Sequence, residues 1–142
     1  MSRNYYSEIN LHIVWHTKES QPALINEVEK ATHQCIRQRV IDTPDAFIHE
    51  IGGINDHVHL AVTIAPTILV SNFIGQLKGG SGHDANQKLG RKVIQWQAGY
   101  GVVSFGKRDL PWVIKYIRNQ REHHRVGSIH QRLETIEQRE DP

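Results

Sequence analysis

The sequence predicts an α+β fold in which helices pack on an antiparallel sheet. Residues 9–16 and residues 56–64 alternate apolar and polar side chains, as half-buried strands do. Apolar residues recur at three- and four-residue spacing over residues 24–40, in a helix that Pro22 is expected to open. The same spacing returns over residues 110–125. Two kinds of periodicity within one short chain indicate a sheet with packed helices.

The remaining elements follow from glycines and short apolar runs. Residues 47–51 form a strand of imperfect alternation that ends at Gly52-Gly53, so it is expected to pair with residues 56–64 as a hairpin. A helical stripe over residues 68–78 meets Gly79-Gly80-Ser81-Gly82, where a break is predicted because each glycine disfavours a helix by up to about 1 kcal/mol. Two further short strands are expected, residues 93–96 and 100–105.

Length and composition indicate one domain, residues 1–142, with a short tail of mixed charge at 128–142. Cys35 stands alone, so no internal disulfide forms and the reducing cytoplasm is the expected compartment. No apolar run approaches the roughly 18 residues of a membrane span, and the N-terminus lacks a signal-peptide profile. A membrane protein is therefore not expected.

Positive charge is concentrated in the middle of the chain. The net charge is +2, yet residues 75–125 carry 10 Lys and Arg against 3 Asp and Glu. This distribution suggests a polyanion bound at one face, although a solvated basic helix face gives the same count. The candidate DNA contacts are Lys78, Arg91, Lys92, Lys107 and Arg108.

Two histidines in the second strand are candidate metal ligands. Because side chains alternate along a strand, His57 and His59 project to one side, about 7 Å apart along the strand. Two neutral imidazoles so placed can hold one divalent cation and leave positions open for a substrate. The alternative is a half-buried strand with two solvated or hydrogen-bonded histidines.

A second candidate group lies on the last helix. Tyr116, Gln120 and His123 form a row beside its apolar stripe. The amide oxygen of Gln120 is a hard ligand that suits Mg²⁺ or Mn²⁺. A cation held by His57, His59 and Gln120 would lie within reach of the Tyr116 hydroxyl, although a tyrosine at this position taken alone is more often a packing residue.

Four segments in this order resemble the single-tyrosine HUH transposases of small bacterial insertion sequences and their REP-associated relatives. They are Asn55-Asp56-His57-Val58-His59-Leu60, Gln76-Leu77-Lys78-Gly79, Trp96-Gln97-Ala98-Gly99-Tyr100-Gly101 and Tyr116-Ile117-Arg118-Asn119-Gln120-Arg121-Glu122-His123-His124. One departure follows Lys78-Gly79, where relatives often carry a serine pair and an arginine but this chain has Ser81-Gly82-His83.

The resemblance implies a ferredoxin-like (RRM-like) sheet with a C-terminal catalytic helix. It also implies cleavage and rejoining of single-stranded DNA at hairpin-marked element ends, through a 5′-phosphotyrosine and with Mg²⁺ or Mn²⁺. Tyr116 would be the nucleophile, and His57, His59 and Gln120 the metal ligands. The family is typically homodimeric, with a tyrosine helix completing the partner's histidine pair, and acts on the bacterial nucleoid.

Three other classes are weighed against this one. A non-catalytic protein that binds DNA or RNA hairpins on the same fold would explain the basic middle without a covalent step. A histidine-triad hydrolase needs a histidine two residues beyond His59, and position 61 is Ala61. Other HUH nucleases, such as replication initiators and relaxases, are usually longer.

Overall fold

The chain folds around a four-stranded antiparallel sheet, seen in a computed structural model that describes residues 4–137. The strands are β1 (Ile9–His16), β2 (Ala46–Ile54), β3 (His57–Ile64) and β4 (Gly101–Phe105). They lie in the order β2-β3-β1-β4, and each neighbouring pair is antiparallel. One helix separates β1 from β2 and another separates β3 from β4, which is the ferredoxin-like order, so the predicted fold class is confirmed.

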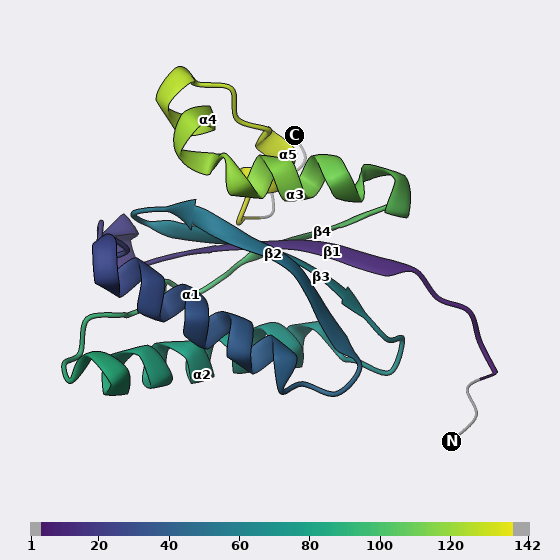
Figure 1. Ribbon diagram of the computed structural model, residues 1–142, viewed down its shortest axis with the longest axis horizontal. Coiled ribbons are helices and arrows are strands. Elements are labelled where there is room, and N and C mark those ends of the chain that lie inside the picture. Colours follow the sequence, from purple (N-terminus) through teal and green to yellow (C-terminus); the bar gives the residue numbers. More distant parts are fainter. Residues whose placement is uncertain (1–3, 138–142) are drawn as a thin grey trace.

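Helices cover both faces of the sheet (Figure 1). One face carries α1 (Asn26–Ile41) and α2 (Val70–Leu89), and the other carries α3 (Leu110–Arg118), α4 (Gln120–Val126) and α5 (Gln131–Glu134). Short 3₁₀ turns, η1 (Lys18–Ser20) and η2 (Lys107–Asp109), follow β1 and β4. The main core lies under α1 and α2, while Ala61, Val113 and Ile117 form a smaller cluster under α3. Among residues 4–137, no helix combines the length and apolar character needed to cross a bilayer.

The predicted helix break at residues 79–82 is wrong, because α2 continues through this segment. A Cβ on Gly80 would lie 2.6 Å from the side chain of Arg39 on α1, whose guanidinium pairs with Asp84 on α2. The glycine therefore leaves room for the Arg39 guanidinium, and the packing of α2 against α1 outweighs the low helix propensity of the glycines. The segment is not the flexible loop that its composition indicates.

Three other predicted boundaries change in the structure. The first helix begins at Asn26 rather than near Pro22. Residues 93–96 do not form a strand, and only Trp96 makes an isolated bridge to Thr17. The last helix is divided at Asn119, whose φ of −103° and ψ of 28° are not helical. The strand predicted at residues 100–105 is present as β4.

The close approach of α3 to β2 positions the last two long helices. A Cβ on Gly52 would overlap the carbonyl oxygen of Ile117, so only glycine permits this contact without a shift. Arg118 at the end of α3 donates two hydrogen bonds to Glu50 of β2, at 3.1 and 2.8 Å. Arg121 of α4 donates one to Glu29 of α1, at 2.8 Å. These contacts hold α3 against β2 and α4 against α1 of the same chain.

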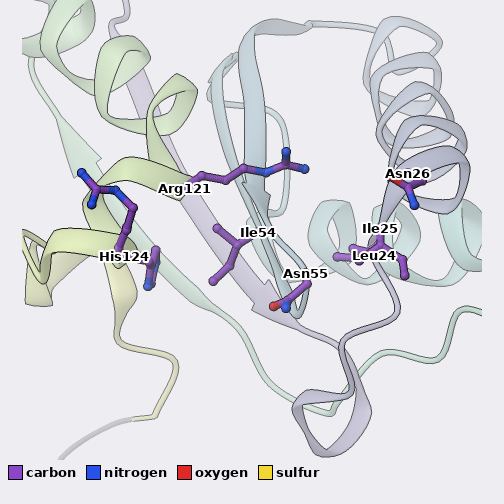
Figure 2. A pocket seen from close by; sticks show the side chains of 8 residues that line it. Leu24, Ile25, Asn26, Ile54, Asn55, Arg121 and His124 are labelled. Atoms are coloured by element: carbon purple, nitrogen blue, oxygen red, sulfur yellow. The ribbon is translucent and has the colours of Figure 1, made fainter.

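An open groove of about 620 Å³ lies between α4 and the beginning of α1 (Figure 2). Arg121 and His124 reach toward it from α4, and Ile25 and Asn26 lie on the opposite wall. Ile54, at the end of β2, lies between the two walls. The groove therefore follows the end of the sheet at which β3 begins.

Replacing Gly52 by alanine is expected to destabilise the fold by about 1–3 kcal/mol, because the new methyl group would displace the backbone of α3. Gly75 of α2 is the matched control, since a Cβ there meets no atom within 4 Å. Gly75→Ala should stabilise by about 0.5–1 kcal/mol, because alanine favours a helix interior. Urea unfolding of both variants measures the difference, and equal free energies of unfolding would contradict the packing argument.

Candidate active site

Two imidazoles on β3 form the centre of the candidate site. His57 and His59 point to the sheet face that α3 covers, with ring centroids 4.9 Å apart. Val58 and Leu60 point instead into the main core. Strand alternation thus places the two histidines side by side, as the sequence predicts. Both side chains are almost fully buried.

His57 is oriented by two neighbours. Its Nδ1 atom lies 2.7 Å from a carboxylate oxygen of Asp56, and its ring stacks on His16 with centroids 4.8 Å apart. A carboxylate at Nδ1 leaves Nε2 facing the site, as in many metal-binding histidines. Burial lowers the pKa of His57, but hydrogen bonds to Asp56 and Glu134 outweigh it and raise the pKa to about 9.

His59 has another histidine as its partner. Its Nδ1 atom lies 2.8 Å from Nε2 of His12 on β1, and both residues are buried. Burial lowers the pKa of His59 to about 4 and that of His12 to about 3, so both rings are neutral near pH 7. Two neutral rings share one proton across this contact. With Nε2 of His12 as the donor, Nε2 of His59 keeps its proton and faces Glu134; with Nδ1 of His59 as the donor, Nε2 of His59 has a lone pair for a cation.

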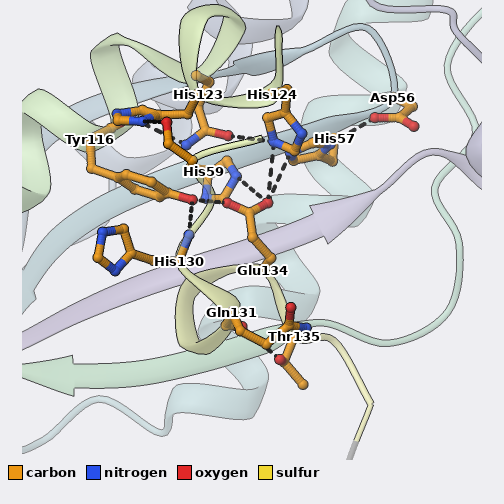
Figure 3. Close-up of polar contacts among 12 residues, drawn as sticks. Asp56, His57, His59, Tyr116, His123, His124, His130, Gln131, Glu134 and Thr135 are labelled. Atoms are coloured by element: carbon orange, nitrogen blue, oxygen red, sulfur yellow. Dashed lines mark hydrogen bonds and ion pairs between the residues drawn. The ribbon is translucent and has the colours of Figure 1, made fainter. Parts of the chain in front are cut away.

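A carboxylate from the C-terminal segment lies among three imidazoles (Figure 3). One oxygen of Glu134 in α5 is 3.3 Å from Nε2 of His57, 3.2 Å from Nε2 of His59 and 3.4 Å from Nε2 of His124. We call these three residues the histidine cluster. The other Glu134 oxygen accepts a hydrogen bond from the Tyr116 hydroxyl. Burial raises the pKa of Glu134, but hydrogen bonds from His57 and His59 hold it well below its usual value, so the group is ionised.

Tyr116 on α3 is buried, with 2% of its surface exposed. Its ring meets His59 edge-on with centroids 6.0 Å apart and stacks on Trp112 at 5.5 Å. Its hydroxyl donates to Glu134 and accepts a hydrogen bond of 3.0 Å from the backbone N–H of His130. Burial and the contact with Glu134 raise the pKa of Tyr116 to about 12. The phenol is therefore protonated and a poor nucleophile while Glu134 is in place.

Gln120 reaches the histidine cluster through a neighbour on α4. Its amide oxygen is 3.0 Å from Nε2 of His124, and its amide nitrogen donates to the backbone carbonyl of Tyr116. His123, the third member of the predicted row, packs its ring on Tyr116 with centroids 4.7 Å apart. The row predicted from the helical spacing is thus present and faces the site.

The histidine cluster and Glu134 have the donors that a divalent cation needs. The Nε2 atoms of His57 and His59 are buried and have no hydrogen-bond partner of good geometry among the residues described. Together with Nε2 of His124 and an oxygen of Glu134, they lie within 4.8 Å of one another. Adjacent ligands of an octahedral cation at about 2.1 Å are about 3.0 Å apart. The separations of 3.2–3.4 Å from the Glu134 oxygen are within a few tenths of an ångström of that spacing.

Comparison with known proteins assigns the chain to a family. The sequence model of the family described as "Transposase IS200 like" matches residues 5–120. The chain belongs to the IS200-like transposase family. It is therefore a transposase, an enzyme that cleaves DNA, and the family predicted from its motifs is confirmed.

Individual relatives agree with this assignment. The transposase for insertion sequence element IS200 from Salmonella typhimurium is 30% identical over 122 residues, which cover 82% of this chain and 79% of that protein. The ISDra2 transposase TnpA from Deinococcus radiodurans is 24% identical over 127 residues, which cover 84% of this chain and 89% of that protein.

Two solved structures share the fold of this transposase. A candidate transposase from Deinococcus radiodurans superposes with a TM-score of 0.66 and 21% identity, covering 84% of this chain and 96% of the other. A REP-associated tyrosine transposase bound to a REP hairpin superposes with a TM-score of 0.60 and 17% identity, covering 91% and 75%.

The five basic residues predicted to contact DNA do not share one surface of the transposase. Lys78 on α2 donates to two backbone carbonyls in the loop before β4, at 2.8 Å each. Arg91 and Lys92 are exposed in the segment after α2. Lys107 and Arg108 are exposed in η2, which leads to α3 on the opposite face of the sheet (Figure 1). This part of the chain contributes to both helical layers, and DNA contact by these five residues stays a prediction.

His124 and Glu134 lie in the site but are not among the residues predicted from the sequence. His124 follows Gln120 by four residues, and this spacing, which places both on one helix face, was the available signal. Glu134 lies in a short tail without periodicity or a recognisable motif, and the family match ends at residue 120. No sequence pattern points to it.

The free energy of unfolding should fall by about 1–3 kcal/mol between pH 6.5 and pH 9.5 in the presence of a chelator. Because folding raises the pKa of His57 from 6.5 to about 9, its stabilising effect is complete below pH 6.5. That effect is lost as the pH rises through about 9. Urea unfolding at several pH values measures it.

Glu134→Gln removes one of the two carboxylates that favour the protonated His57, so its pH dependence should be at least halved. Glu137→Gln, an exposed change in the same tail, is the control and should retain the full dependence. An equal pH dependence in both variants would show that Glu134 does not stabilise the charged imidazole.

Proposed function

We propose that Tyr116 attacks a phosphodiester of single-stranded DNA and forms a 5′-phosphotyrosine at hairpin-marked element ends. One observation carries the proposal: a single carboxylate, that of Glu134, joins the Tyr116 hydroxyl to the histidine cluster. A phosphate offers the same pair of anionic oxygens. We infer that the scissile phosphate takes the place of this carboxylate, with one oxygen at the histidines and its phosphorus near the phenol.

Access to this position requires the tail to leave. With Tyr116 2% exposed, no substrate reaches the phenol while residues 128–137 cover it. Leu133 anchors the tail with 3% exposure, and Arg132 donates to the Ser104 carbonyl at 2.6 Å. An α-helix of four residues has little stability of its own. These few contacts can be exchanged for contacts with DNA.

The bonds broken and formed balance without an added reactant. The phenol of Tyr116 gives up its proton to water, and its oxygen forms a bond to phosphorus. The bond between phosphorus and the 3′ oxygen breaks, and that oxygen takes up a proton and leaves as a 3′-hydroxyl. Because the phosphotyrosine keeps the energy of the broken ester, a 3′-hydroxyl can reverse the step and rejoin strands.

We propose that Mg²⁺ or Mn²⁺ is held by His57 and His59 from β3 and by Gln120 and His124 from α4. When bound, such a cation neutralises charge on the phosphate and favours the phenolate. Asp56 and His12 would keep the two β3 imidazoles in the tautomer whose Nε2 is a ligand. The contact between Nε2 of His124 and the amide oxygen of Gln120 would be exchanged for bonds to the cation, because it uses the same two atoms.

One chain brings together every residue named here, so we propose that residues 1–142 act as one transposase domain. A homodimer, which the family resemblance implies, would keep the same contacts if α3 and α4 were exchanged between subunits. A structural relative is bound to a REP hairpin, which supports hairpin DNA as the partner of this transposase. We propose that it acts in the bacterial cytoplasm. The second candidate is a hairpin-binding protein without catalysis. It gives no role to the hydrogen bond from the Tyr116 hydroxyl to the ionised Glu134.

Tyr116→Phe should abolish covalent DNA attachment while changing DNA affinity less than about twofold, because only the nucleophilic oxygen is lost. Hairpin oligonucleotides with random flanks, incubated with Mn²⁺ or Mg²⁺ and analysed on a denaturing gel, reveal the adduct. Tyr100→Phe is the control and should retain it, since Tyr100 packs against the main core. An adduct that survives in Tyr116→Phe would overturn the assignment of the nucleophile.

Glu134→Ala should lower the oligonucleotide concentration for half-maximal adduct formation at least about fivefold, because the substrate no longer competes with a bound carboxylate. Adduct yield against DNA concentration, at saturating Mn²⁺, is the measurement. Glu137→Ala in the same tail should match the wild type. Loss of adduct in Glu134→Ala would instead mean that the carboxylate takes part in the reaction.

A further inference from the structure

The groove between α4 and the first turn of α1 is continuous with the candidate active site (Figure 2). His124 lines it and also lies 3.4 Å from the Glu134 oxygen at the histidine cluster. Asn55, in the turn before Asp56 and His57, lines the same groove. A strand whose phosphate lies at the histidine cluster would therefore enter this groove with a neighbouring nucleotide.

The lining of the groove suits a nucleotide. Ile25 and Ile54 offer apolar surface, and Ile25 is 51% exposed, so its side chain is accessible to a base. Arg121 and Arg125 supply positive charge, and no acidic residue lines the groove in the part of the chain described. The volume of about 620 Å³ falls in the range of small-ligand sites, about 300–1,000 Å³.

Two amides in the groove have no use inside the protein. The side chains of Asn26 and Asn55 make no hydrogen bond within residues 4–137, and both are exposed. Asn26 has a positive φ of 49°, a conformation that asparagine tolerates better than most residues. Each amide offers donors and an acceptor, the groups that distinguish one base edge from another.

We propose that this groove binds the unpaired nucleotide next to the scissile phosphate and selects its base through Asn26 and Asn55. The base lies against Ile25 and Ile54, and the next phosphate lies near Arg125. Both side chains of the ion pair between Arg125 and Glu122 are exposed, so Arg125 can turn to a phosphate at little cost. The inference rests on the proposed function, because the position of the scissile phosphate defines which nucleotide is adjacent.

The test uses binding rather than cleavage, with every protein carrying Tyr116→Phe. The probe is a pool of DNA hairpins flanked on each side by ten random nucleotides, and bound molecules are sequenced. The parent protein should enrich one base at least about fivefold at a single unpaired position. The combined change Asn26→Gly and Asn55→Ala should reduce this enrichment below about twofold and leave total affinity within about twofold. Glycine preserves the positive φ at position 26.

Reversing the charge of Arg125 tests the affinity for DNA separately from the base preference. Arg125→Glu should weaken binding to the pool about three- to tenfold and keep the base preference, because a phosphate contact carries no sequence information. Lys88→Glu on α2, on the opposite face of the sheet, makes the same change of charge and should bind like the parent. Far-ultraviolet circular dichroism confirms that each variant is folded.

An unchanged base profile in the asparagine variant would overturn the proposal, as would equal affinities of Arg125→Glu and Lys88→Glu. Failure of the proposed function gives a different result. In that case the protein with Tyr116 intact forms no adduct in Mn²⁺ or Mg²⁺, while the groove variants still alter binding to the pool.

Discussion

The close packing of α3 on β2 is the contact on which the candidate site depends. Because Gly52 has no side chain, the backbone at Ile117 lies against the strand. Tyr116, one residue earlier, then reaches the carboxylate of Glu134, which also contacts His57 on β3. If a methyl group at position 52 moved α3 away from the sheet, the Tyr116 hydroxyl would be separated from the imidazoles.

Burial decides the charge of each group in the site. At His12 and His59 burial outweighs the attraction of the Glu134 carboxylate, so both rings stay neutral near pH 7. His57 has Asp56 on one side and Glu134 on the other, and these two anions outweigh burial. Neighbouring histidines on one strand therefore differ in charge. The protonated His57 and ionised Glu134 compensate each other in a buried site.

Periodicity predicted much of the fold and part of the site. The alternation in β3 was enough to place His57 and His59 on one face, and helical spacing was enough to align Tyr116 with Gln120. Glu134 was beyond such reasoning, because its position depends on how an irregular tail folds back over the sheet. The helix break predicted at the glycines of α2 was wrong for a related reason. The Arg39 side chain that lies beside Gly80 is about forty residues away in the sequence.

The interruption at Asn119 separates Tyr116 from Gln120 and His124. Tyr116 belongs to α3, which is fixed to the sheet, whereas Gln120 and His124 belong to α4, and one non-helical residue joins the two. An unbroken helix would move all three side chains as a rigid unit. Under the proposed function, a joint at Asn119 would let α4 move to release a DNA end while the Tyr116 ring stays packed against the sheet, so release of a strand and retention of the covalent intermediate would not depend on one movement.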